Sequence, residues 1–278
     1  MHLIYGMKKI TPFILLILSI QIFSQSQEIE PTFYSEISEI VSSKDYFKVK
    51  FGNPETIIVL DTTFAYSSKI LTEKIVYDFK TKNRIEIEKF KQSELSAKEL
   101  IDLDSKNRII NYKGNIKYNS GKWYETLVKY EYKKKKKIKK KINDAGEVYL
   151  KYIVFYDKLN FPIKIESTIV GTEDTRMQVV NYDYKNSKFT LMEFNYQGKL
   201  ENETKGNFNQ KYIVKTNKMN DPTEMYWILT DIKEPYFHEL NYKYDSNGNW
   251  IEFIKVLRKP NGEKETLQKV FREINYKN

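Results

Sequence analysis

The 278-residue sequence contains no cysteine, two histidines, 10 glycines and 7 prolines. Without cysteine there is no disulfide framework, no thiolate metal site and no lipobox residue to carry a lipid anchor. Only His238 lies beyond the N-terminal segment described below, so a histidine-based metal cluster is excluded. A Ser-His-Asp site would need His238, which alternates with Leu240 and Tyr242 as in a half-buried strand. The scattered glycines form no phosphate-binding loop.

Aromatic residues are abundant, with 22 Tyr and 16 Phe among an aromatic share of 15%. Apolar residues make up 40% and charged residues 30%, a balance typical of a globular rather than a disordered chain. Tyrosine favours strands and half-buried surfaces, so this composition favours a β protein. The length allows one large all-β domain or two small ones.

The N-terminus resembles a signal for export. Lys8 and Lys9 precede the apolar stretch Phe13 to Phe23, which is followed by the small and polar residues 24–26. The apolar stretch is shorter than the roughly 20 residues that span a bilayer. We therefore predict a signal peptide over residues 1–26, with Met7 as the true start. The mature chain, 27–278, is expected in the periplasm or at the cell surface, as neither a lipoprotein nor a transmembrane protein. Removing Lys8 and Lys9 leaves 45 basic and 37 acidic residues, a moderate excess.

Period-two alternation recurs along the whole mature chain. In Trp123 to Tyr132, alternate positions are aromatic or β-branched, and Arg84 to Glu88 alternates apolar with charged residues. Residues 31–45 are ambiguous: we favour a short helix or an irregular entry, and a short strand is the alternative. Ser93 to Leu100 fits a helix. We predict an all-β, single-domain antiparallel meander, open or curled, with at most one or two short helices. Two domains that meet near residues 141–146 are the alternative.

The clearest hairpin is Asn241 to Val256. Asn247-Gly248 is the dipeptide most compatible with positive φ at both centres of a tight turn, and Asp245 can bond the amides of the turn that it opens. We therefore assign Asp245, Asn247 and Gly248 a structural role in this turn.

Tyr-Asp occurs four times after an aromatic or β-branched strand, at Tyr77, Tyr156, Tyr182 and Tyr244. We interpret the four aspartates as turn residues of a repeated hairpin with an irregular period. Residues 242–250 (YKYDSNGNW) and 272–276 (REINY) resemble the YD-repeat (Rhs-like) proteins, in the degenerate form of exported proteins from Bacteroidetes-type bacteria. The resemblance implies strips of antiparallel sheet and an exported protein, and it implies hardly any activity.

The sharpest charged feature is a run of eight lysines around Ile138: Lys133, Lys134, Lys135, Lys136, Lys137, Lys139, Lys140 and Lys141. Such a run is a candidate site for a polyanion, for example an anionic glycan of the cell envelope. The alternative is a long hairpin, residues 130–142, whose exposed edge the lysines protect against strand pairing. Nucleic acid is not the expected partner, because the run lacks the arginines of bidentate phosphate recognition.

Trp123, Trp227 and Trp250 are candidates for an aromatic platform that stacks on sugars, or alternatively for core and cross-strand packing. Three functions remain open. The first is a non-catalytic interaction or scaffold protein, whose partner is an envelope glycan or another surface protein. The second is a polyanion binder that uses the lysines. The third is a carboxylate-dependent hydrolase, since the separation of carboxylates cannot be read from a sequence. No cofactor is expected.

Overall fold

One antiparallel sheet accounts for almost all of the regular structure in a computed structural model, which describes residues 31–41, 46–64, 70–118, 120–172, 174–229 and 237–277. The predicted signal peptide lies outside these residues. The predicted all-β meander is confirmed, and the sheet does not close. Its elements are α2 (Phe33–Val41), β1 (Pro54–Phe64), β2 (Ile70–Thr81), β3 (Arg84–Lys91), β4 (Glu94–Leu103), β5 (Ile109–Lys117), β6 (Trp123–Lys133), β7 (Lys136–Ile142), β8 (Val148–Tyr156), β9 (Pro162–Ile169), β10 (Thr175–Asp183), β11 (Lys188–Phe194), β12 (Leu200–Asn207), β13 (Ile213–Thr216), β14 (Pro222–Tyr226), β15 (Phe237–Tyr244), β16 (Trp250–Arg258) and β17 (Lys264–Tyr276).

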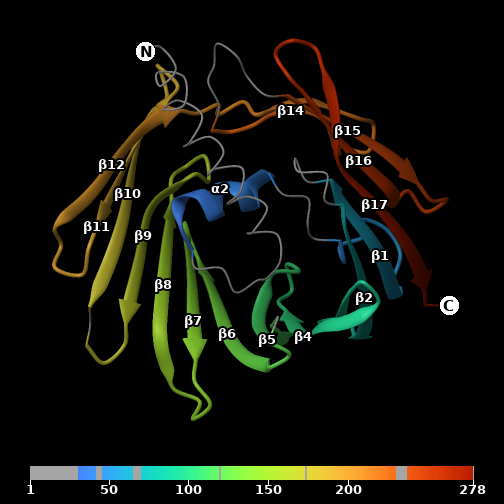
Figure 1. Cartoon of the computed structure of the whole chain (residues 1–278), viewed down its shortest axis with the longest axis horizontal. Helices are drawn as coiled ribbons and strands as arrows, with labels where there is room; N and C mark the ends of the chain where they lie inside the picture. The colour runs from blue at the N-terminus through green and yellow to red at the C-terminus, as the bar shows by residue number, and fades with distance from the viewer. Residues whose placement is uncertain are drawn as a thin grey trace, which may run out of the picture.

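Consecutive strands pair from β1 to β12 and from β13 to β17, and β1 also pairs with β17, so the sheet runs without a break from β13 through β17 and β1 to β12. Figure 1 shows this sheet curled around the short helix α2. The helix confirms the favoured expectation over Phe33–Val41, while residues 42–45 lie outside the described residues; its Phe33 and Ile37 side chains are fully buried. No helix within the described ranges has the length and apolar character needed to cross a membrane.

The second helical expectation, Ser93 to Leu100, is wrong. These residues belong to β4, which pairs with β3 and β5 on its two sides. Ala97, Glu99 and Ile101 alternate on its buried face, and Lys89 of β3 forms an ion pair of 2.7 Å with Glu99. The stretch consists of good helix formers, but pairing on both sides outweighs an intrinsic preference of a few tenths of a kcal/mol per residue.

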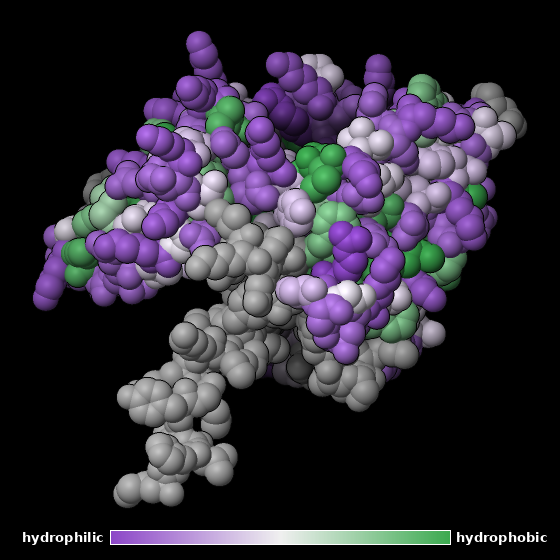
Figure 2. Space-filling view, turned by 90° about the horizontal axis from the view of Figure 1, so that it is seen from above, coloured by the Kyte–Doolittle hydropathy of each residue, from purple (hydrophilic) through white to green (hydrophobic). Residues whose placement is uncertain are grey.

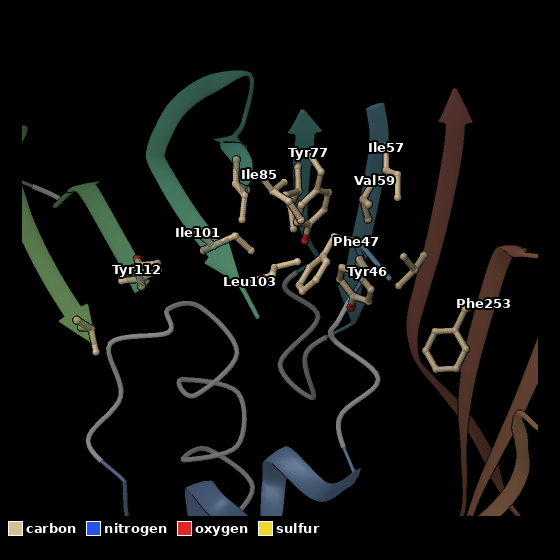
Figure 3. Packing of buried hydrophobic residues seen from close by; sticks show 14 of the residues in the cluster. Tyr46, Phe47, Ile57, Val59, Tyr77, Ile85, Ile101, Leu103, Tyr112 and Phe253 are labelled. Carbon is tan, nitrogen blue, oxygen red and sulfur yellow. The ribbon is translucent and has the colours of Figure 1, made fainter. Parts of the chain in front are cut away.

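Two hydrophobic clusters fill the inner face of the sheet. The first joins the segment before β1 to β1–β6 and β14–β17, with Tyr46 and Phe47 packed beside Ile57 and Tyr77 (Figure 3). The second joins α2 to β8–β11 through Phe33, Phe189 and Leu191. The face of the molecule in Figure 2 is mainly hydrophilic, with hydrophobic residues in small, separate groups.

Eight of the hairpin loops share one pattern of hydrogen bonds. The first residue of each loop accepts a bond from the N–H three residues later and donates its own N–H to the carbonyl four residues later. The fourth residue is glycine or asparagine with positive φ, as expected for a three-residue hairpin loop. The loops begin at Asp104, Tyr118, Asn143, Asp157, Asn195, Asn217, Asp245 and Lys259.

This loop pattern corrects part of the Tyr-Asp interpretation. Asp157 and Asp245 open such loops, and Asp183 accepts a bond from the amide of Asn186 in a different turn. Asp78 lies inside β2, where its carboxylate pairs with Lys80. In six of the eight loops the recurring unit is therefore Asp or Asn followed three residues later by Gly or Asn, and Tyr-Asp marks only some of its copies.

Candidate functional site

The lysine run forms the end of β6, a two-residue turn and β7. The expectation of an exposed edge is wrong, because β7 pairs with β6 on one side and β8 on the other. Strand alternation sends Lys137, Lys139 and Lys141 to the inner face and Lys136 and Lys140 to the outer face. The run therefore does not present eight equivalent charges.

The positive charge of Lys137 is compensated by two carboxylates inside the curl of the sheet. Its ammonium lies 2.8 Å from a carboxylate oxygen of Glu36 and 2.8 Å from one of Glu39, both on α2. Tyr156 of β8 donates a hydrogen bond of 2.6 Å to the other oxygen of Glu36. Burial alone would lower the pKa of Lys137, but the two carboxylates raise it well above its usual value. Lys137 is therefore charged and occupied.

Lys139 is 3% exposed and lies between Tyr130 and Tyr152 of the adjacent strands. Burial, with the nearby charges of Lys141 and Lys137, lowers the pKa of Lys139 to about 8. On the outer face, Lys140 pairs with Glu131. These lysines serve the packing and charge balance of the sheet and are not presented to a partner.

Of the five other lysines, Lys141 is half-buried. Lys133, Lys134, Lys135 and Lys136 are exposed and form no ion pair with any described residue. Three of them line an open hollow of about 300 Å³, which we call the lysine hollow. Its lining residues are Arg108, Tyr132, Lys133, Lys135, Lys136, Lys137, Tyr156 and Asn160.

Two neighbouring loops hold the sides of the lysine hollow. The guanidinium of Arg108 lies 4.2 Å from the ring centre of Tyr132 and is paired with Asp104 at 2.6 Å. On the other side, Lys135 donates a bond of 2.8 Å to Oδ1 of Asn160. The hollow is thus built from three adjacent hairpin ends, and Arg108 and Asn160 are lining residues that the lysine pattern alone does not reveal.

The backbone of Lys135 has a φ of 59°, in the left-handed region that glycine or asparagine fills in the eight loops described above. A lysine here costs roughly 1 kcal/mol relative to glycine. The turn thus carries a charged side chain at a conformational cost. Its ammonium is held by neutral oxygens, Oδ1 of Asn160 and the carbonyl of Lys158, so its charge remains available to an anion.

The three tryptophans do not form one platform. Trp123 is 45% exposed at the start of β6. Trp250 is partly buried in the first cluster, with the guanidinium of Arg272 at 3.5 Å from its ring centre, and Trp227 packs edge-on against His238. Packing therefore accounts for Trp227 and Trp250, and only Trp123 keeps an exposed ring.

The Asp245 turn has the structural role assigned to it, with one correction. Gly248 has a φ of 84°, but Asn247 is not among the residues with positive φ. Gly248 donates its N–H to the carbonyl of Asp245, so Ser246 and Asn247 are the central residues of the turn. Oδ1 of Asp245 accepts the N–H of Asn249, which completes the loop.

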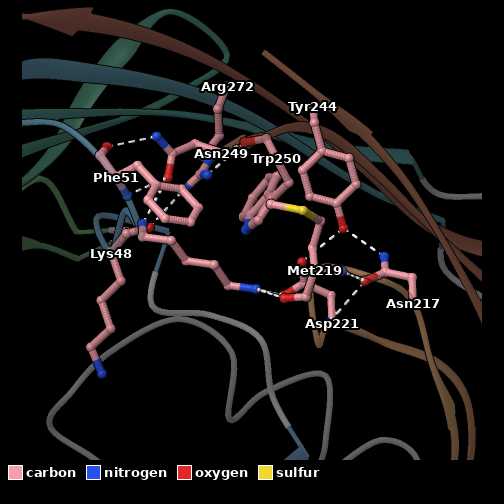
Figure 4. Close-up of polar contacts among 10 residues, drawn as sticks. Lys48, Phe51, Asn217, Met219, Asp221, Tyr244, Asn249, Trp250 and Arg272 are labelled. Carbon is pink, nitrogen blue, oxygen red and sulfur yellow. Dashed lines mark hydrogen bonds and ion pairs between the residues drawn. The ribbon is translucent and has the colours of Figure 1, made fainter. Parts of the chain in front are cut away.

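Asn249, which the sequence did not single out, is 1% exposed, and its side chain makes four hydrogen bonds (Figure 4). Its Oδ1 accepts the N–H groups of Lys50 and Phe51, and its Nδ2 donates to the carbonyl of Phe51 and the hydroxyl of Tyr276. Arg272 donates to the carbonyls of Tyr46, Lys48 and Trp250. This network ties the segment before β1 to β15–β17, and burial lowers the pKa of Arg272 to about 10.

His238 is 6% exposed, and its Nδ1 has no hydrogen-bond partner among the described residues. Burial lowers the pKa of His238 well below its usual value, and the charge of Lys255 lowers it further. Among the described residues, no group of three or more His, Asp or Glu side chains is placed to hold a metal ion.

Neither a protein-family model nor a curated protein matches the chain. Solved structures do match, among them two that are each 10% identical in sequence. The first is a porin-like protein from Bacteroides uniformis ATCC 8492, with a TM-score of 0.30 over 81% of this chain and 98% of that chain. The second is a porin-like protein from Bacteroides vulgatus ATCC 8482, with a TM-score of 0.31 over 81% of this chain and 99% of that chain. Likenesses this low carry no argument about function.

Proposed function

We propose that this chain is an exported, non-catalytic binding protein of the cell envelope and that the lysine hollow binds an anionic polymer. One observation carries the proposal: Lys133 to Lys136 converge at a single hairpin end without an ion-pair partner among the described residues. The apolar stretch Phe13 to Phe23 after Lys8 and Lys9 supports export.

The chemistry of the lysine hollow favours multivalent electrostatic contact over recognition of one rigid group. Lysine ammonium groups are flexible point charges, whereas arginine offers a planar fork that matches a carboxylate or phosphate. Asp104 already pairs with Arg108, so the free charge comes from lysines alone. An extended polymer with regularly spaced sulfate, phosphate or carboxylate groups suits such a surface.

The test is binding of fluorescently labelled dextran sulfate and polygalacturonate to the mature protein, with neutral dextran as the comparison. Both anionic polymers should bind at low salt, and the affinity should fall steeply as salt is raised, because counterions are released on binding. Neutral dextran should not bind.

A triple variant, Lys133→Gln, Lys135→Gln and Lys136→Gln, should weaken binding on the order of tenfold and flatten the salt dependence. The matched control removes three exposed lysines from other turns at the same end of the sheet, Lys82, Lys185 and Lys218, each changed to Gln. This control has the same net charge as the first triple variant, but it should bind the anionic polymers nearly as tightly as the wild type does. Equal losses in the two triple variants would contradict a localised site.

A further inference from the structure

The two ends of the sheet are β12 and β13. β12 pairs with β11 on one side, and no described strand pairs with its other side. Figure 1 shows β12 as the border of the sheet at the left of the view. Residues 200–203 and Lys205 are exposed. An edge of eight residues with free backbone groups is a template for another strand.

The register shows which backbone groups of β12 are free. Phe208 donates its N–H to the carbonyl of Ser187, and the ladder then pairs Phe189 with Gly206 and Leu191 with Thr204. In an antiparallel ladder, hydrogen-bonded pairs alternate with non-bonded pairs. Gly206, Thr204 and Asn202 therefore bond to β11. The N–H and C=O groups of the residues between them, Glu203 and Lys205, point away from the sheet.

The side chains of these same residues carry alternating charge. Thr204 lies opposite the buried Leu191, on the inner face, so Glu203 and Lys205 project from the outer face. Within one chain, these two side chains form an ion pair of 2.8 Å, with 41% and 72% of each side chain exposed. An exposed pair of this kind contributes little to stability, so its partners can be exchanged at small cost.

We propose that two copies of this chain pair antiparallel through β12, with Thr204 opposite Thr204 on the two-fold axis. In this register Glu203 of each copy faces Lys205 of the other, and both residues have their backbone groups directed at the partner strand. A shift by two residues would place Glu203 opposite Glu203, and like charges directly opposite are unfavourable. Only the register centred on Thr204 places both copies of Glu203 opposite Lys205, and the arrangement is self-complementary, as a two-fold interface requires.

A second copy is the occupant that these charges fit. Edge strands that are protected from pairing carry charges that repel a neighbouring strand in any register. In β12 the sequence Glu203-Thr204-Lys205 is complementary to a second, antiparallel copy of itself, because each glutamate then lies opposite a lysine. The inference rests on β12 alone and is independent of the lysine hollow, which β6–β9 and the β4–β5 loop build.

The native chain has no cysteine, so a single introduced cysteine reports the register directly. Residues opposite each other in a non-hydrogen-bonded antiparallel pair have Cα atoms about 4.5 Å apart, which lies within the disulfide range. Thr204→Cys should therefore form a disulfide-linked dimer on mild oxidation of the mature protein. The control Asn202→Cys lies on the same face, but its counterpart is four residues away along the strand, about 13 Å, so this variant should form no disulfide-linked dimer.

Charge exchange gives a second test, read by sedimentation at protein concentrations up to about 100 μM, a range suited to weak interfaces. Glu203→Lys places lysines opposite lysines and should raise the dimer dissociation constant about tenfold. Adding Lys205→Glu to that variant exchanges the two charges and should restore the wild-type constant.

The proposal is overturned by any of three results. These are a wild-type protein that stays monomeric over the whole range, equal cross-linking of the two cysteine variants, and failure of the double charge exchange to restore the association that Glu203→Lys removes. Capture of β12 by a strand of another protein would appear as the first of these.

Discussion

The hydroxyl of Tyr276, at the end of β17, donates a hydrogen bond of 2.5 Å to Oδ2 of Asp245, while Oδ1 of the same carboxylate closes the β15–β16 loop. The same relationship recurs on this side of the sheet: Tyr184 bonds to Asp157, and Asn217 donates to the hydroxyl of Tyr244. In each case a tyrosine at the end of a later strand holds the first residue of an earlier loop. These tyrosines link successive hairpins side by side.

This linkage predicts coupling between Tyr276 and Asp245. Tyr276→Phe should lower the free energy of unfolding by about 1–2 kcal/mol, since it removes bonds to both Asp245 and Asn249. Asp245→Ala should cost about 1 kcal/mol. The double variant should lose less than the sum, with a coupling near 1 kcal/mol in a denaturant-unfolding cycle. Strict additivity would mean that the short contact contributes nothing. If Asp245→Ala instead left stability intact but abolished binding, Asp245 would be a site residue.

Gly248 should be the most restrictive position of the same loop. Its φ is 84°, and an added Cβ would lie 3.0 Å from Cε of Met219 and 3.4 Å from the ring of Phe51. Gly248→Val should cost about 1–3 kcal/mol, more than Asp245→Ala, because a β-branched residue is strained at positive φ. Gly248→Asn is the control, since asparagine fills the equivalent position in three other loops and should cost less. Thermal unfolding of the variants gives the order, and a reversed order contradicts this account.

In the contact between α2 and β7, removing one charge of the Glu36–Lys137 pair should destabilise the protein more than removing both charges. Lys137→Met leaves Glu36 buried opposite an apolar side chain and should destabilise the protein by about 3–5 kcal/mol. Glu36→Gln combined with Lys137→Met should recover much of that loss, because the buried charge is then absent. The control Lys136→Met, one residue earlier and exposed, should change stability by less than about 0.5 kcal/mol. An equal loss in the single and double variants, measured by urea unfolding, would argue against this explanation.

His238 should make folding sensitive to acid. Its pKa is lowered in the folded protein, so the unfolded chain takes up a proton near pH 6.5 and the folded chain does so only at lower pH. The stabilising contribution of neutral His238 is therefore complete above about pH 6.5 and is lost as pH falls towards the folded pKa. As the pH is lowered from 8 to 5, the free energy of unfolding of the His238→Phe variant should fall less than that of the wild type. In the mature chain His238 is the sole histidine, so its ring resonances should not titrate near pH 6.5 in NMR spectra. A normal titration would contradict the buried, neutral ring.

Local patterns were enough to predict the strand-and-turn character of the chain. The alternation in Trp123 to Tyr132 and the Asp245 loop identified β6 and the β15–β16 hairpin. β12 escaped notice because Leu200 to Asn207 is polar on both faces and shows no apolar alternation. The prediction of a helix at Ser93 to Leu100 was wrong because the helix propensity of these residues is outweighed by strand pairing with β3 and β5. The resemblance to YD-repeat proteins stays a prediction.

The candidate site could be predicted only in part. The run of lysines drew attention to the correct hairpin, but burial of Lys137 depends on Glu36 and Glu39, which are remote in the sequence. Arg108 and Asn160 come from separate loops that the sheet brings beside β6 and β7. No local pattern marks such residues, because their proximity is a consequence of strand order.

The sequence by itself determined most of the strands and turns, because alternation along a strand and positive φ in a turn are properties of a few adjacent residues. Pairing with neighbouring strands decided the rest, as in β4 and β12. Only the tertiary structure decided which lysines remain free, which tryptophans are covered and which strand ends the sheet. Those outcomes depend on the curl that brings α2 against β7 and on pairing between β1 and β17, contacts between residues far apart in the chain. Charge and burial are set by such neighbours, so the same residue type can stabilise the interior at Lys137 and remain available to an anion at Lys133.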